Sequence, residues 1–171
     1  MREDNFIPTA RLALESDLPG ILSILNTAIE ETAAHWNLAP MTAREGKVWF
    51  RTRGGKGFPT LVVDGAEGVV GFATFDAFRP YQGFNRTVEH SIYVAPHAYR
   101  RGVGRALLRE VIARAAELKM HALIAGIESG NEASLALHRE EGFEVVGCLP
   151  QVGRKLDRWL DLVFMQRLLS E

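Results

Sequence analysis

The sequence has one cysteine, almost no net charge and no long hydrophobic run. Because Cys148 is the only cysteine in 171 residues, an intramolecular disulfide and a cysteine-based zinc site are excluded. Its neighbours in the sequence are apolar, so we expect Cys148 to be a small buried residue rather than a nucleophile. Twenty Lys and Arg against twenty-one Asp and Glu give a net charge of −1. This balance argues against general binding to nucleic acid or to a membrane surface.

No uncharged stretch approaches the roughly 18 residues of a membrane-spanning helix, and the N-terminal segment lacks the apolar centre of a signal peptide. We therefore expect a cytoplasmic protein. A composition of 47% hydrophobic and 24% charged residues is that of an ordinary globular protein. Its length predicts a single domain over residues 1–171. No metal site is predicted.

Two common phosphate-binding motifs are also missing. A P-loop needs Gly-Lys-Ser or Gly-Lys-Thr, and neither occurs in the chain. A dinucleotide fingerprint, G-x-G-x-x-G, needs a third glycine at the position that Leu107 occupies. Any phosphate site must therefore be of another kind.

The tract 88–110 combines a β-type run, a proline turn, a loop rich in Arg and Gly, and a helical pattern. The first N–H groups of a helix have no internal partner and lie at the positive end of its dipole, so such a loop can bind an anion. Gly102 and Gly104 allow close approach of the backbone, and Arg100, Arg101 and Arg105 add positive charge. The tract predicts a pyrophosphate site. The alternative is an ordinary strand-to-helix turn with solvated arginines.

The hydrophobic periodicity predicts a mixed sheet with helices on both faces, an α/β (α+β) architecture. Ser16 is expected to cap the first helix, with Pro19 near its start, and Thr42 with Glu45 forms a capping-box pattern for a short second helix. Residues 51–59 are predicted to form a loop. The expected strands are 9–14, 61–63, 69–78, 87–94, 122–127, 143–149 and 160–168, and the later helices are 102–118 and 131–141.

This order of elements resembles the GNAT superfamily of N-acetyltransferases, whose pyrophosphate motif is Q/R-x-x-G-x-G/A. Residues 99–104 read Y-R-R-G-V-G, so Tyr99 departs from the usual first residue. Farther along, N-E-A-S at 131–134 and the pair Gly142-Phe143 are similar to two further superfamily features. The resemblance implies the GNAT fold, with a central sheet of about seven strands, and acetyl-CoA as the co-substrate.

A narrower resemblance covers nearly the whole chain. F-R-P-Y at 78–81 and T-V-E-H-S at 87–91 are similar to the phosphinothricin acetyltransferase family, and especially to its members that acetylate methionine sulfone and methionine sulfoximine. It implies transfer of an acetyl group to the α-amino group of a small amino acid analogue. It also implies a homodimer.

The same resemblance suggests roles for the acceptor side. Glu89 is the expected general base, and His138 is the candidate acid that protonates the CoA thiolate, although a helix histidine is often structural. Because side chains alternate along a strand, His90 should face away from Glu89. Arg79 offers a fork for the acceptor's carboxylate. The expected acceptor-lining residues are Arg79, Pro80, Tyr81, Glu89, His90, Ser91 and Trp36.

On the donor side, the backbone of Ile92, Tyr93 and Val94 is expected to pair with the amides of pantetheine, as an added strand would. The pyrophosphate would be bound by Arg100, Arg101, Gly102, Val103, Gly104 and Arg105. Asn131 is expected near the pantetheine, with an ordinary N-cap as its competing role.

Two other functions are compatible with the sequence. A protein or peptide N-terminal acetyltransferase of the same fold would need an open groove, whereas the bulky tract 78–84 favours a closed pocket. A non-catalytic acyl-CoA-binding module would not need Glu89.

Overall fold

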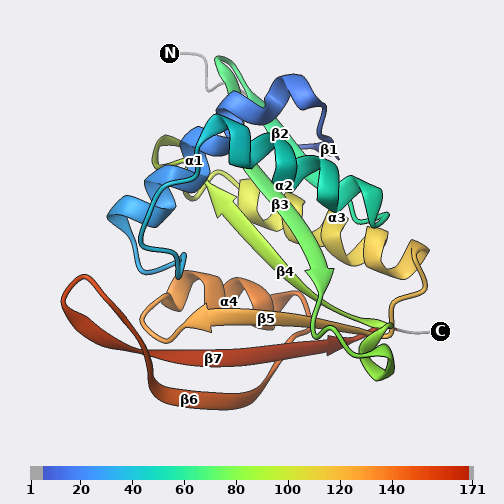
Figure 1. Ribbon diagram of the computed structural model, residues 1–171, viewed down its shortest axis with the longest axis vertical. Helices are drawn as coiled ribbons and strands as arrows, with labels where there is room; N and C mark the ends of the chain where they lie inside the picture. Colours follow the sequence, from blue (N-terminus) through green and yellow to red (C-terminus); the bar gives the residue numbers. More distant parts are fainter. Residues whose placement is uncertain (1–5, 170–171) are drawn as a thin grey trace.

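The computed structural model describes residues 6–169 (Figure 1). Four helices are present in the described residues: α1 (Leu18–Glu31), α2 (Ala43–Gly55), α3 (Val103–Glu117) and α4 (Glu132–Glu140). The strands are β1 (Ala10–Leu12), β2 (Thr60–Gly65), β3 (Gly68–Ala77), β4 (Thr87–Val94), β5 (Ala122–Glu128), β6 (Glu144–Lys155) and β7 (Arg158–Leu168). No helix among them is both long and apolar enough to span a membrane.

The seven strands form one mixed sheet in the order β1-β2-β3-β4-β5-β7-β6, and β4 and β5 are its parallel pair. Alternate residues of β2 face opposite helices, since Val62 belongs to the core with α1, whereas Leu61 and Val63 belong to the core with α3. The predicted mixed sheet with helices on both faces is confirmed.

Several local predictions were wrong in their bounds. The second helix is not short, and it continues to Gly55 through the segment predicted as a loop. Its Thr42–Glu45 capping box is present, and Trp49 packs against the core with α1, so docking outweighs the poor helix propensity of the glycines. Asp17, after a short 3₁₀ turn, is the N-cap of α1 in place of Ser16. The first strand is only three residues long, and β6 runs six residues farther than predicted.

The prediction that Cys148 is buried was also wrong, because the side chain is exposed. Its apolar neighbours belong to β6, which is one of the two edge strands of the sheet. Val146 and Leu149 are themselves 57% and 44% exposed. An apolar run in the sequence therefore marks a surface here instead of the core.

Candidate active site

The two central parallel strands separate halfway along their length. β4 pairs with β5 only from Thr87 to His90, opposite Ala122 to Ala125, and Figure 1 shows the two strands diverging beyond that point. On its other side β4 stays paired with β3 as far as Val94. The backbone of residues 91–94 therefore presents peptide groups without a strand partner towards β5.

A cavity of about 60 Å³ lies at this separation. It is lined by Ala34, His90, Ser91, Ile92, Tyr93, Ala125, Gly126, Ile127, Glu128, Asn131, Ser134 and His138. An extended chain with amide groups could enter here and bond to the free edge of β4 as a strand would. The arrangement fits the pantetheine arm that the sequence predicts for residues 92–94.

Glu89 lies half-buried on the face of the sheet that carries Gly126. A Cβ at position 126 would lie 2.9 Å from Glu89 Oε1, next to Leu162 and Phe164. Burial raises the pKa of Glu89, and the positive charge of Arg79 opposes that rise. A carboxylate with a raised pKa is a suitable proton acceptor near neutral pH.

The predicted carboxylate clamp, Arg79, follows the end of β3 by two residues, and its charge acts on this carboxylate. Its guanidinium stacks 4.0 Å from the ring centroid of Phe78, and Nη1 donates to the Phe78 carbonyl at 2.8 Å. Phe78 in turn contacts Phe84 and Phe164, with ring centroids 5.8 and 6.4 Å apart. Arg79 is exposed and has no carboxylate within ion-pair distance in the described chain, so its charge is available.

His90 points to the opposite face, as predicted, and is 6% exposed. Its Nε2 lies 2.9 Å from His138 Nε2, and both rings contact Phe143. His138 Nδ1 lies 2.7 Å from the Ser134 carbonyl. Both ring nitrogens of His138 therefore have partners within the protein, although the ring also lines the cavity.

The phosphate loop has the backbone conformation that its glycine requires. Gly102 is the N-cap of α3 with φ of 81°, a left-handed conformation that favours glycine, and no side chain caps this helix end. Arg100 also has a positive φ, of 59°. The first N–H groups of α3 thus lack a side-chain acceptor and can bind an anion, which fits the predicted pyrophosphate.

Two arginines of the loop have partners within the protein. Arg101 stacks 4.7 Å from the ring centroid of Phe6. Arg105 forms an ion pair with Glu140 and lies 3.8 Å from Glu141, both near the end of α4. All three arginines are exposed, but Arg100 has no side-chain hydrogen bond or ion pair within residues 6–169. The backbone N–H groups of α3 and the side chain of Arg100 are therefore the groups of this site that are not bonded to other side chains.

Asn131 has the N-cap role, since its side chain accepts a hydrogen bond from the Ser134 N–H at 3.2 Å, and it also lines the cavity. Glu128, which the sequence analysis did not single out, lines the same cavity and is 6% exposed. Its carboxylate lies 4.0 Å from Arg158. In the sequence, the isolated Gly126 within a predicted strand was a signal that another group approaches the backbone closely there, and in the structure that group is the Glu89 carboxylate.

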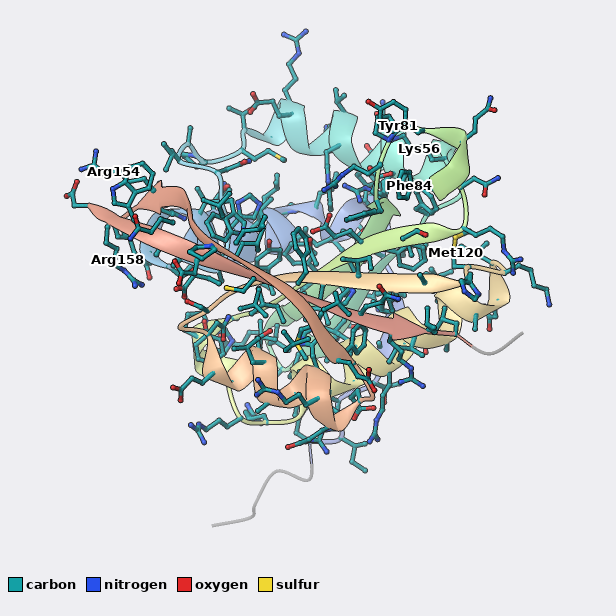
Figure 2. The ribbon with its side chains drawn as sticks, turned by 90° about the horizontal axis from the view of Figure 1, so that it is seen from below. Lys56, Tyr81, Phe84, Met120, Arg154 and Arg158 are labelled. Carbon is teal, nitrogen blue, oxygen red and sulfur yellow. The ribbon has the colours of Figure 1, made fainter. Side chains whose placement is uncertain are left out.

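The remaining acceptor-side residues are not all brought together. Ser91 lines the cavity, whereas Tyr81 is 71% exposed and Pro80 is also exposed. Figure 2 shows Tyr81 and Phe84 together on the segment after β3. Trp36 lies against Gly153 of β6, where a Cβ would be 2.4 Å from its ring.

A known protein family matches most of this chain. Residues 21–143 match the Acetyltransferase (GNAT) family. The chain belongs to this family, which confirms the resemblance, the fold and the enzyme class predicted from the sequence.

Its relatives narrow the class further. An L-methionine sulfoximine/L-methionine sulfone acetyltransferase from Pseudomonas aeruginosa is 49% identical over 152 residues, 88% of each chain. The solved structure of a ribosomal-protein-alanine N-acetyltransferase from Brucella melitensis is 50% identical, with a TM-score of 0.91, and covers 94% of this chain and 99% of its own. A GNAT phosphinothricin acetyltransferase from Sinorhizobium meliloti, solved with AcCoA, is 37% identical, with a TM-score of 0.93, and covers 96% and 90%.

Proposed function

We propose that this protein transfers the acetyl group of acetyl-CoA to the α-amino group of a small amino acid analogue. Methionine sulfoximine, methionine sulfone and phosphinothricin are the candidate acceptors. The observation that carries the proposal is the half-buried Glu89, with its raised pKa, beside the opening between β4 and β5. The names of the relatives support the choice of acceptors.

The reaction proceeds by direct attack. Glu89 takes a proton from the acceptor's ammonium group, directly or through one water, and the free amine attacks the thioester carbonyl carbon. In the tetrahedral intermediate the attacking nitrogen gives up its second proton and the C–S bond breaks, so that the products are the amide and a CoA thiolate, which is protonated. Much of the rate comes from holding the two reactants together, which is worth an effective molarity of about 10⁵ M or more.

The proton donor for the thiolate is assigned to His138, whose ring reaches the cavity wall. In the resting geometry its Nδ1–H donates to Ser134, and its Nε2 is held by His90. Proton transfer from His138 Nε2 therefore requires that this atom first take up a proton and that its bond to His90 be exchanged during the reaction. This assignment stays a prediction.

Acetyl-CoA is held by backbone groups in this proposal. The pantetheine pairs with residues 92–94, and the pyrophosphate binds the N-terminus of α3 at Gly102, with Val103 and Gly104 beside it. The Val94 N–H polarises the thioester carbonyl and stabilises the oxyanion. Arg100 adds charge from solvent, and Arg101 and Arg105 would have to leave their present partners to reach the phosphates.

The acceptor's carboxylate is assigned to Arg79. Its positive charge acts on Glu89 without an ion pair between them, so one small zwitterion could present its ammonium to Glu89 and its carboxylate to Arg79. Pro80, Tyr81, Ser91 and Trp36 complete the proposed acceptor side.

A protein N-terminus is the competing acceptor, and the name of the Brucella melitensis relative favours it. The decisive experiment measures thiol release from acetyl-CoA with methionine sulfone, methionine sulfoximine, phosphinothricin and a peptide that begins with alanine. We expect the free amino acid analogues to be turned over at least 100-fold more efficiently than the peptide. Methionine sulfone with an amidated carboxylate should also be poor. Preference for the peptide would overturn the proposal.

We also propose a cytoplasmic homodimer built on β6. This edge strand has backbone groups without a strand partner on one side, and it exposes apolar side chains. Both features favour association with a second copy of the chain. They are Val145, Val146, Leu149 and Val152, together with Leu156 from the turn after β6 and Trp159 from the adjoining β7. Sedimentation equilibrium should give twice the chain mass of 19.0 kDa. Val146→Glu should give a monomer, and a monomeric wild type would contradict the proposal.

A further inference from the structure

The loop between α1 and α2 is bound to the far end of the β6–β7 hairpin. Lys155, the last residue of β6, is 6% exposed, and its Nζ donates to the His35 carbonyl at 2.7 Å. Its neighbour Arg154 is exposed instead. Figure 2 shows Arg154 and Arg158 at the outer end of the hairpin, far from Tyr81 and Phe84.

The burial of this ammonium group is unusual. Lys155 has no carboxylate within ion-pair distance in residues 6–169, and burial lowers its pKa. A buried cation whose recorded partner is one backbone carbonyl is costly to desolvate. A fold that needed only to fill this space would do so at less cost with an apolar side chain.

A second contact joins the same two segments. The Trp36 ring covers Gly153, two residues before Lys155 on β6, so closely that a Cβ there would lie 2.4 Å from Cζ3. Only glycine lets the ring take this position. The loop is thus attached to the hairpin through a backbone carbonyl and through a side chain.

From this attachment the loop reaches the reaction cavity. The His35 ring packs against Tyr93 of β4, with centroids 5.5 Å apart, and Ala34 forms part of the cavity wall. The hairpin is 120 residues away in sequence from the loop that it holds. We propose that Lys155 and Gly153 are positioning residues for acetyl transfer, because they hold the α1–α2 loop, which carries the proposed acceptor-side residue Trp36, against the β6–β7 hairpin and over the cavity.

This inference rests on the proposed function and adds a determinant of acceptor binding to it. Loss of the attachment should leave the donor contacts in place, because they are backbone groups of residues 92–94, which stay paired with β3, and of the N-terminus of α3. It should raise the KM of the acceptor and leave that of acetyl-CoA nearly unchanged.

The experiment compares Lys155→Met and Gly153→Ala with matched controls. Methionine keeps the unbranched shape and most of the length of the side chain without its charge, and such replacements of buried ions are often neutral or stabilising. Gly147→Ala is the control for Gly153→Ala, since it lies on the same strand with open space around it. Lys47→Met removes an exposed lysine from α2.

We expect both test variants to raise the acceptor KM at least fivefold, with the KM of acetyl-CoA within twofold of wild type and the unfolding midpoint little changed. Lys155→Arg should retain an acceptor KM within about threefold of wild type. Unchanged acceptor KM values, or equal rises for both substrates, would overturn the inference.

Hydrogen exchange provides a readout that does not depend on turnover. The Asn37 N–H is bonded to His35 Nδ1 at 3.0 Å, and the Ala34 N–H to Thr32 Oγ1 at 3.1 Å. Both amides should exchange faster in Lys155→Met and Gly153→Ala, but not in the controls. If both amides exchanged faster in the test variants while wild type acetylated none of the candidate acceptors, the proposed function would be wrong but the attachment of the loop would be supported. Equal exchange in all variants would refute the attachment.

Discussion

His90 and His138, from β4 and α4, share one hydrogen bond between their Nε2 atoms at 2.9 Å. Because His138 Nδ1 donates to the Ser134 carbonyl, its Nε2 carries the lone pair when the ring is neutral. His90 Nε2 must then be the donor. This leaves His90 Nδ1 unprotonated, and it is the buried side-chain atom without a hydrogen-bond partner in residues 6–169.

The histidine pair should make stability depend on pH. Burial lowers the pKa of both side chains, that of His90 to about 3, from an ordinary value of 6.5. For His90, the unfolded chain binds more protons than the folded one between these values, so stability falls as the pH drops below 6.5, by up to about 1.4 kcal/mol per pH unit. His138 contributes in the same direction. We expect urea unfolding at pH 5.5 and 7.5 to show a smaller difference in His90→Phe than in wild type. An equal difference would contradict the neutral pair.

The same pair allows a test of the proton donor. If His138 protonates the thiolate, His138→Phe should lower kcat by about 10²-fold, the usual contribution of general acid catalysis. The KM of acetyl-CoA should stay within about threefold. Pre-steady-state measurements must confirm that the chemical step limits the rate. A kcat within threefold of wild type would assign the proton to solvent.

Glu89 should show opposite effects on activity and on stability. Glu89→Gln removes the base and should lower kcat/KM by about 10²- to 10⁴-fold. Because burial raises the pKa of Glu89, the folded state binds more protons than the unfolded state just above the ordinary value of 4.5. This group's contribution to stability therefore falls as the pH rises through that window.

Glu89→Gln is thus expected to be more stable than wild type at pH 7.5. The control is Glu144→Gln, which replaces an exposed carboxylate on β6 and should match wild type in activity and in stability. In wild type, kcat/KM should rise with pH through a pKa above 4.5. Full turnover in Glu89→Gln would show that the reaction does not use Glu89 as its base. Absence of turnover in wild type would instead indicate a non-catalytic acyl-CoA-binding module.

Gly126→Ala should displace this carboxylate without unfolding the protein. The added Cβ would lie 2.9 Å from Glu89 Oε1, the end of a flexible side chain that can rotate away. We expect kcat to fall at least tenfold, with an unfolding midpoint close to that of wild type and of Gly147→Ala. Wild-type kcat would mean that the position of Oε1 is not critical.

Much of this fold follows from local sequence. β4 has the predicted bounds because β-type residues lie between two turn segments, and α3 differs from prediction by one residue at each end. The Thr42–Glu45 capping box was readable in the same way. The placement of Glu89 and His90 on opposite faces followed from the alternation of a strand.

What the sequence could not provide are contacts between distant segments. His90 meets His138 across 48 residues, and Lys155 meets His35 across 120. Neither pair has a local signature, since an isolated histidine or lysine is compatible with many environments. Exposure of Cys148 was missed for a related reason: local hydrophobicity does not reveal which strand lies at the edge of a sheet.

Cys148 offers a chemical test of the dimer, because it lies on β6 among the side chains proposed to meet the second copy. In the isolated chain it is exposed and should react readily with a thiol reagent. In a dimer we expect the reaction to be at least tenfold slower at high protein concentration, and to accelerate on dilution below the dissociation constant. Val146→Glu should react rapidly at every concentration. If wild type reacted equally fast at all concentrations while sedimenting as a dimer, the interface would lie elsewhere than on β6.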